Sequence, residues 1–284
     1  MNTGTLSEIY MMKGKLIMSA GNFSDVWKHS VLLEVIDLIK SEDFIYVESH
    51  GNYPVHKVTS NGNGHYGIRK IENSGINDED MHYLTHQNST LRGGSICYLS
   101  SWILVNKFLN YHGISNKAYI HEIDKAISKE AIFYLQSIDL IAGTNLNRDI
   151  EIINKDGFSG IINLINKKVT PNLVFIDPYY KRKVSEEIDK IISITEQLDE
   201  FKIPYLIWLP YKKSQKHKGA YNKLLNKFNN EVLTLNDNNP GSINNSTNIT
   251  KTGMIFSRSI IDLMPWVEYK LKPYENSKMQ WRIM

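Results

Sequence analysis

The chain has 284 residues, with 33 Lys and Arg against 30 Asp and Glu, which gives a formal net charge of +3. Hydrophobic residues make up 42% of the chain and charged residues 22%, which excludes a mainly disordered protein. A net charge this small also excludes a general polycation. Any binding of nucleic acid must therefore come from local basic patches.

The single cysteine, Cys97, excludes an intramolecular disulfide framework and a cysteine-rich zinc site. The sequence contains no apolar run of about 18 residues or more, and its first residues lack the apolar core of a signal peptide. We therefore expect a cytoplasmic protein that does not contact a membrane.

Short apolar runs rich in β-formers alternate with helical patterns along the chain. In chain order the patterns predict a helix at 24–40, a strand at 43–49, a helix at 94–109, a strand at 117–123, a helix at 123–135, a strand at 149–156, a helix at 158–165, a strand at 172–178, a helix at 184–201, a strand at 203–209, a helix at 218–228, and strands at 231–235 and 253–258. This alternation predicts an α/β fold with a mostly parallel seven-stranded sheet and helices on both faces.

Residues 54–92 break the alternation because they are polar, rich in Gly and Asn, and only weakly periodic. We interpret them as a small subdomain inserted after the first strand of a single domain that spans residues 1–284. A second interruption, at 236–253, contains a Pro-Gly pair and many Asn, Ser and Thr residues, and predicts a loop between two late strands.

Four successive predicted strands end in an acidic residue: Glu48, Glu122, Asp156 and Asp177. Ligands of open α/β sheets bind outside the carboxyl ends of the strands, so these acids predict a binding crevice there. Glu122, after the second sheet strand, is placed to accept hydrogen bonds from ribose hydroxyls, and Asp156 to meet an adenine amino group. Any one of these acids could instead simply cap the following helix.

The sequence lacks both GxGxxG and GxxxxGK[ST], which excludes the usual pyrophosphate cradle and the P-loop. A nucleoside-like ligand without a phosphate chain fits better, and S-adenosylmethionine is the common one. Lys28 and His29, in the first predicted helix, are candidate contacts to its methionine carboxylate or its adenosine. The alternative is that both are solvated residues of a first helical turn.

The tetrapeptide Asp177-Pro178-Tyr179-Tyr180 directly follows an apolar strand. It looks like the [Asp/Asn]-Pro-Pro-[Tyr/Phe] signature of amino-methyltransferases, in which an acid and a backbone carbonyl accept the hydrogens of an exocyclic amine. We therefore interpret Asp177 as a catalytic residue and Pro178 as a substrate contact. Tyr180 would stack on a base that has left its stack, which adds about 1–3 kcal/mol per base.

Basic residues follow this tetrapeptide and recur later in the chain. Lys181, Arg182 and Lys183 are predicted to contact phosphates of a nucleic-acid substrate. A second group has the same predicted role: Lys212, Lys213, Lys216 and Lys218. The alternative for both groups is an ordinary solvated surface.

The segment Ala20–His29, AGNFSDVWKH, resembles the AGNxxDVxKH segment of the ribosomal RNA large subunit methyltransferase J family. Further likenesses to the family follow in the same order: Ser49-His50, Gly94-Ser95, His121-Glu122, Asp156-Gly157-Phe158 and Thr252-Gly253-Met254. Order and spacing agree from about residue 19 to the end of the chain, so the resemblance covers nearly all of it.

The resemblance implies a Rossmann-like methyltransferase fold with a small insertion, and transfer of a methyl group from S-adenosylmethionine to N6 of one adenine of 23S ribosomal RNA. It implies no metal, protein-free ribosomal RNA as the partner, and no obligate protein partner. Asp177 would be the catalytic residue. The cofactor-binding residues implied are Lys28, His29, His50, Ser95, Glu122, Asp156, Gly157 and Asp177.

The chain departs from the family pattern at two places near the implied site. His50-Gly51-Asn52-Tyr53-Pro54 stands where the family has His-Ala-Gly-Ala-Gly, and Tyr179 replaces the second proline of Asp-Pro-Pro-Tyr. These departures motivate one alternative, a non-catalytic member that binds RNA or the cofactor. A second alternative is a DNA adenine-N6 methyltransferase, which the same tetrapeptide would serve. A nuclease ranks last, because the sequence shows no carboxylate pair with metal-site spacing.

Overall fold

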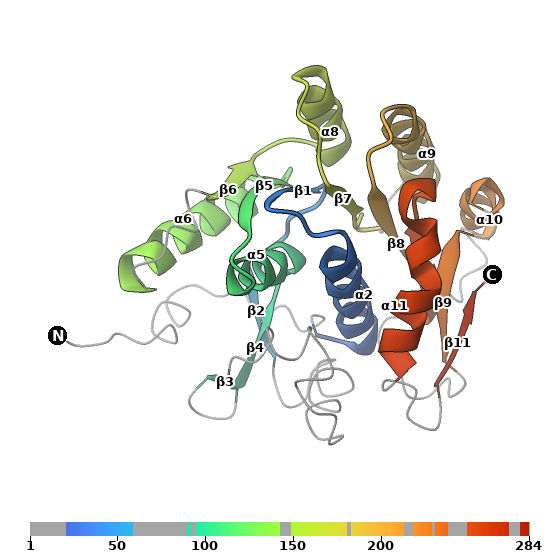
Figure 1. Cartoon of the computed structure of the whole chain (residues 1–284), viewed down its shortest axis with the longest axis horizontal. Coiled ribbons are helices and arrows are strands. Elements are labelled where there is room, and N and C mark those ends of the chain that lie inside the picture. The colour runs from blue at the N-terminus through green and yellow to red at the C-terminus, as the bar shows by residue number, and fades with distance from the viewer. Residues whose placement is uncertain are drawn as a thin grey trace.

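The computed structural model describes residues 21–58, 90–91, 95–142, 149–180, 183–212, 218–228, 231–237, 249–272 and 279–283. Within these residues the chain forms an eight-stranded sheet covered by helices and a separate three-stranded sheet (Figure 1). In the same part of the chain, no helix is long and apolar enough to cross a membrane.

The strands of the large sheet are β1 (Asp43–Glu48), β5 (Ser115–His121), β6 (Ile150–Ile153), β7 (Leu173–Ile176), β8 (Tyr205–Lys212), β9 (Val232–Asp237), β10 (Ile249–Phe256) and β11 (Met279–Ile283). Their order is β11-β9-β10-β8-β7-β1-β5-β6. The run from β6 to β8 is parallel, whereas β10 pairs antiparallel with β8 and β9. All seven predicted strands and the mostly parallel sheet are confirmed. The edge strand β11 was not predicted.

The helices are α2 (Phe23–Ile39), α5 (Ser101–Tyr111), α6 (Lys125–Ala142), α8 (Gly157–Asn166), α9 (Val184–Glu200), α10 (Lys218–Lys227), the 3-10 helix η4 (Arg258–Leu263) and α11 (Met264–Leu271). Helix α2 begins after Asn22, whose side-chain oxygen accepts a hydrogen bond from the Asp25 N–H at 3.1 Å. Both η4 and α11 lie beyond the last predicted strand and were not predicted.

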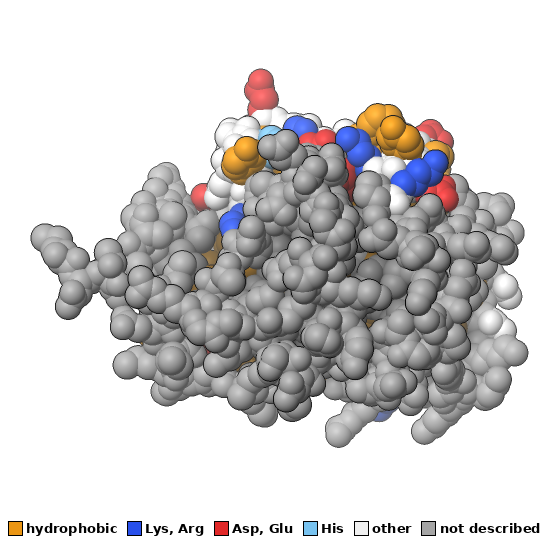
Figure 2. All heavy atoms as spheres, turned by 90° about the horizontal axis from the view of Figure 1, so that it is seen from below, with side chains coloured by type: hydrophobic (Ala, Val, Ile, Leu, Met, Phe, Trp, Pro, Cys, Tyr) orange, Lys and Arg blue, Asp and Glu red, His pale blue; other side chains and the backbone are white. Residues whose placement is uncertain are grey.

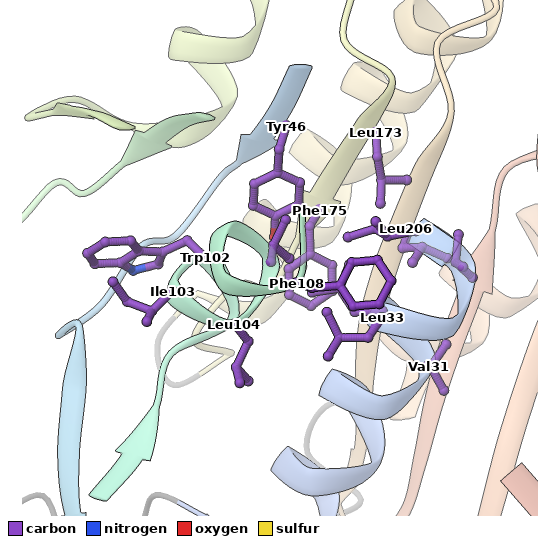
Figure 3. Packing of buried hydrophobic residues seen from close by; sticks show 14 of the residues in the cluster. Val31, Leu33, Tyr46, Trp102, Ile103, Leu104, Phe108, Leu173, Phe175 and Leu206 are labelled. Atoms are coloured by element: carbon purple, nitrogen blue, oxygen red, sulfur yellow. The ribbon is translucent and has the colours of Figure 1, made fainter. Parts of the chain in front are cut away.

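Helices cover both faces of the large sheet because side chains alternate between the faces along each strand. Tyr46 of β1 points to the face covered by α2, α5 and α11, whereas its neighbour Val47 packs on the face covered by α8, α9 and α10. Figure 3 shows the first of these cores, with side chains of α2 and α5 packed against the sheet. It labels Val31, Leu33, Trp102, Phe108, Phe175 and Leu206 among its members.

The predicted helix at 94–109 is wrong in its first part. Residues Ser95–Leu99 form strand β4, which pairs antiparallel with β2 (Val55–Val58) and β3 (Thr90–Leu91), and α5 begins only at Ser101. Pairing with β2 therefore decides the structure of this segment over its local helical pattern. The predicted insertion contributes β2 and β3, and its residues 59–89 lie outside the described residues, so its role as a subdomain stays a prediction.

Candidate functional site

The first turns of α2 lie beside the carboxyl ends of the parallel strands (Figure 1). The Lys28 ammonium of α2 lies 2.8 Å from an oxygen of Asp177, which follows β7, and 3.1 Å from an oxygen of Asp25. It also lies 4.7 Å from the centroid of the Trp208 ring. This cluster ties α2 to the sheet across 149 positions of sequence.

The charges of this cluster are interdependent. Burial lowers the pKa of Lys28, but the carboxylates of Asp177 and Asp25 outweigh burial and hold that pKa above its ordinary value. Burial raises the pKa of Asp177, and the Lys28 cation opposes that rise. Lys28 is therefore the group that favours an ionised Asp177 in a buried position.

A chain of polar contacts continues from Asp177 to the end of β1. The Asp177 backbone N–H donates to the Ser49 hydroxyl at 3.3 Å, and that hydroxyl lies 2.7 Å from Nδ1 of His50. Burial lowers the pKa of His50 to about 4, with the Asp156 carboxylate opposing it. His50 is therefore a neutral imidazole at pH 7, held edge-on against the Phe158 ring at 5.5 Å.

Glu122 lies at the end of β5, and backbone N–H groups hold its carboxylate in place. One oxygen accepts from Asn52 at 2.9 Å and the other from Asp124 at 2.8 Å. Burial raises the pKa of Glu122, and these two donors oppose the rise. Glu122 does not cap α6, because the Asp124 side chain accepts from the first N–H groups of that helix.

At Gly51, in the loop where the sequence departs from the family pattern, the backbone lies close to Ile120 of β5. A Cβ at this position would lie 2.4 Å from a methyl carbon of Ile120, so only glycine fits without a shift. The next residue, Asn52, takes a left-handed conformation with φ 54, which Asn tolerates better than most residues. That conformation directs its N–H to Glu122.

Asp156 and Gly157 connect β6 to α8, and Gly157 packs against Ser49 at the end of β1. Asp156 does cap a helix, because its side chain accepts from the Ser159 N–H at 3.0 Å. Its other oxygen lies 3.6 Å from the Lys190 ammonium. A Cβ at Gly157 would lie 1.9 Å from the Ser49 carbonyl oxygen, so bare backbone is required here as well.

His29 is buried behind Lys28 and faces the small sheet. Its Nδ1 lies 2.8 Å from the Tyr98 hydroxyl, and the two rings stack with centroids 5.4 Å apart. Burial lowers the pKa of His29, and the neighbouring Lys28 lowers it further. The neutral His29 ring thus links α2 to β4.

Ser95, which the resemblance implies as a cofactor contact, opens β4, and its role stays a prediction. The serines at the helix start are Ser100 and Ser101. The Ser101 hydroxyl donates to Glu48 at 2.6 Å, which places this serine at the carboxyl end of β1. In the sequence, the indication for this serine was the pair Ser100-Ser101, which begins five residues after Ser95.

The Tyr180 ring is buried, so it is not exposed for stacking on a base. The residue has φ 44, is 1% exposed, and donates its hydroxyl to the Trp208 carbonyl at 2.9 Å. Its ring packs near Trp208 and Tyr221. The predicted stacking on a substrate base is therefore not met, because this hydrogen bond and the surrounding core hold the ring inside.

The remaining predicted substrate contacts are placed only in part. Pro178 is buried, whereas the adjacent Tyr179 is 62% exposed. Lys183 is exposed and pairs with Glu186 at 3.0 Å. Lys181 and Arg182 lie outside the described residues, as do Lys213 and Lys216. On the face in Figure 2, the described side chains show acidic, basic and apolar types intermixed.

Glu48, at the end of β1, is buried, and the sequence predicted it only as one of four acids at the strand ends. Its oxygens accept from the Tyr46 hydroxyl at 2.7 Å and from the Ser101 hydroxyl at 2.6 Å. Burial raises the pKa of Glu48 to about 8, and these two donors oppose the rise. Its carbonyl oxygen also lies 3.0 Å from Nδ1 of His121.

The raised pKa of Glu48 predicts a pH-dependent loss of stability. The unfolded chain ionises this group near its ordinary pKa of 4.5 and the folded chain only near 8, so the free energy of unfolding falls as pH rises between those values. The full effect is on the order of 4 kcal/mol. Urea unfolding at pH 5 and pH 8 should show a smaller decline for Glu48→Gln than for the wild type. Parallel declines in the two proteins would contradict this pKa.

These features fit S-adenosylmethionine. Gly51 and Gly157 let the loops after β1 and β6 pack closely on Ile120 and Ser49, which holds Glu122 and His50 at the same edge of the sheet. Glu122 has its carboxylate fixed by backbone donors, as a ribose contact requires, and His50 adds no positive charge beside a cationic sulfonium. Among the described residues, no group of three or more His, Cys, Asp or Glu side chains could hold a metal ion.

No family model and no curated protein matches this chain. Among solved structures, LPL1258 from Legionella pneumophila, described as a DUF519 protein, is 19% identical and has a TM-score of 0.67 over 93% of this chain and 97% of that one. An rRNA methylase from Streptococcus thermophilus is 15% identical, with a TM-score of 0.39 over 81% of this chain and 94% of that one.

A third solved structure is the putative methyltransferase SMU.1697c from Streptococcus mutans in complex with SAH. It is 11% identical, with a TM-score of 0.40 over 80% of this chain and 95% of that one. The sheet order, with β10 antiparallel between β8 and β9, and the match to the Legionella protein establish the fold. The chain shares its fold with the Legionella protein, a Rossmann-like α/β fold with a mostly parallel sheet covered by helices.

Proposed function

We propose that this protein transfers a methyl group from S-adenosylmethionine to N6 of an adenine in 23S ribosomal RNA. The observation that carries the proposal is the buried pair of Asp177 and Lys28, 2.8 Å apart, at the sheet edge that also holds Glu122 and His50. The likeness of Ala20–His29 and Asp177–Tyr180 to known methyltransferase motifs supports the choice of substrate.

Asp177 is the catalytic residue of the proposed reaction. When bound, the cofactor supplies a methyl group on a sulfonium, so the amine needs orientation more than activation. The Asp177 carboxylate accepts a hydrogen bond from the exocyclic amine and so aims the nitrogen lone pair. The amine must lose one proton once it carries the methyl group, and the Asp177 carboxylate would accept that proton at its oxygen.

Lys28 acts through Asp177 as a positioning residue. In Lys28→Met, Asp177 stays in place without its cation, so we expect the pKa of Asp177 to rise further. Methyl transfer at pH 7 should then fall at least about tenfold and recover in part at higher pH. The measurement is the transfer rate as a function of pH. Lys223→Met, which breaks the exposed pair with Asp189, is the control. A pH profile unchanged by Lys28→Met would contradict this role.

Glu122 is proposed to bind the cofactor through its ribose. Glu122→Gln removes the charge and one acceptor, and a hydrogen bond to a charged group is worth about 1.5–3 kcal/mol. We therefore expect affinity for S-adenosylmethionine to fall about tenfold or more, measured by titration calorimetry. Glu151→Gln, at an exposed position of β6, should leave the affinity unchanged. Equal affinities in the two variants would remove Glu122 from the cofactor site.

Two other functions are distinguished by one set of assays. Transfer to duplex DNA but not to protein-free 23S ribosomal RNA would indicate a DNA adenine methyltransferase. Binding of cofactor without transfer to either would indicate a non-catalytic member. The pairing of Lys28 with Asp177 favours a catalytic protein over the second, because it holds a carboxylate at the reacting position.

A further inference from the structure

Helix α11 carries two exposed aromatic side chains that the proposed reaction does not use. Trp266 is 48% exposed and Tyr269 is 58% exposed, and their ring centroids lie 5.7 Å apart. The opposite face of α11 holds it to the core through Met264, Val267 and Leu271, which are buried. The buried face therefore anchors α11 to the core, and the two rings on its other face present apolar surface to solvent.

Each ring has a lysine ammonium over it. The Lys270 ammonium lies 5.5 Å from the Trp266 centroid, and the Lys272 ammonium lies 5.6 Å from the Tyr269 centroid. Flat rings flanked by cations are the combination that binds single-stranded nucleic acid, because bases stack on the rings and phosphates meet the cations. An apolar protein partner would not require cations at both rings.

The chain path directs α11 toward the edge of the sheet that holds Asp177. Strand β10 runs antiparallel to β8, so it ends at the opposite edge of the sheet. The helices η4 and α11 follow it, and α11 returns beside α2, whose first turns carry Lys28 (Figure 1).

We propose that Trp266, Tyr269, Lys270 and Lys272, here called the α11 surface, bind a single-stranded segment of the RNA substrate next to the target nucleotide. This inference rests on the proposed function for the identity of the substrate. The target base would be held at Asp177, and flanking bases would stack on the α11 surface. Its contribution is affinity without base identity, because every base has a face that can stack.

The test is RNA binding by the full-length protein, measured by fluorescence anisotropy with a labelled twelve-residue oligoadenylate and with protein-free 23S ribosomal RNA. Trp266→Ala/Tyr269→Ala should weaken binding of both probes about tenfold or more. Lys270→Gln/Lys272→Gln should reduce the slope of log affinity against log salt by about 1.4. The control is Tyr111→Ala, which removes a tyrosine that is 72% exposed at the far end of α5.

Unchanged RNA affinity in the aromatic double variant, or a loss no larger than that of Tyr111→Ala, would overturn the proposal. Dissociation of a dimer by the double variant, with RNA affinity kept, would overturn it in favour of a protein interface. Binding of S-adenosylmethionine should stay unchanged in every variant. If the wild type binds RNA through the α11 surface but transfers no methyl group, the surface stands and the proposed function fails.

Discussion

Asp177→Ala is expected to lower methyl transfer to 23S ribosomal RNA by about a hundredfold or more, the usual scale for losing a positioned group at a reacting centre. Alanine removes the carboxylate that lies 2.8 Å from the Lys28 ammonium. It therefore leaves no side-chain acceptor at this position for the exocyclic amine. The measurement is single-turnover transfer from labelled S-adenosylmethionine.

The control for Asp177→Ala is Asp189→Ala, which removes a carboxylate whose ion pair with Lys223 is exposed. That variant should transfer like the wild type, because an exposed pair contributes little to stability. Thermal unfolding of both variants shows whether lost activity reflects lost fold. Transfer by a folded Asp177→Ala at the wild-type rate would remove Asp177 from the reaction.

Gly157→Ala is expected to damage both the fold and cofactor binding. Its new Cβ would lie 1.9 Å from the Ser49 carbonyl oxygen, and backbone cannot give way as a flexible side chain does. The start of α8 must move away from the end of β1, at a cost of about 1–3 kcal/mol of stability. Affinity for S-adenosylmethionine should fall about tenfold or more, because the shift displaces Asp156 beside it. Urea unfolding and calorimetry measure the two effects.

Gly219→Ala provides a matched comparison in another helix. A Cβ at Gly219, in α10, would meet no atom within 4 Å. The same substitution there should stabilise the protein by up to about 1 kcal/mol, because alanine favours helix over glycine. Equal effects of the two substitutions on stability would contradict the close contact between α8 and β1.

The sequence predicted the parallel part of the fold well because those strands are buried on both faces. Runs such as 43–49 and 172–178 are almost continuously apolar and are followed by polar residues, so both their type and their ends were readable. The edge strand β11 has a less distinctive pattern, and only its pairing with β9 makes it a strand. Helix α11 followed the last predicted strand, where the alternation gave no further expectation.

Local pattern misled the prediction where tertiary contacts decide the outcome. Ile96 and Tyr98 fit a helix or a strand, and pairing with β2 selects the strand, which moves the helix start from Gly94 to Ser101. Tyr180 follows a motif in which the ring faces the substrate. Here its hydroxyl donates a hydrogen bond to the Trp208 carbonyl, which is distant in sequence, and the ring is held in the core.

The sequence identified the acids at the strand ends as candidate site residues, but it could not predict the separate role of each one. Asp156 caps α8, Glu122 accepts from two backbone N–H groups, and Asp177 pairs with Lys28. All four positions read alike in the sequence. Their different roles depend on neighbours that folding brings from elsewhere in the chain, such as Asn52 for Glu122.

The central claim is that Asp177 directs methyl transfer to an adenine amine of 23S ribosomal RNA. The most direct test incubates the protein with labelled S-adenosylmethionine and unmethylated, protein-free 23S ribosomal RNA, and then identifies the modified nucleoside. The account predicts N6-methyladenosine at one position for the wild type and none above background for Asp177→Ala. No labelled N6-methyladenosine from a wild type that binds the cofactor, or equal label from both proteins, would contradict it.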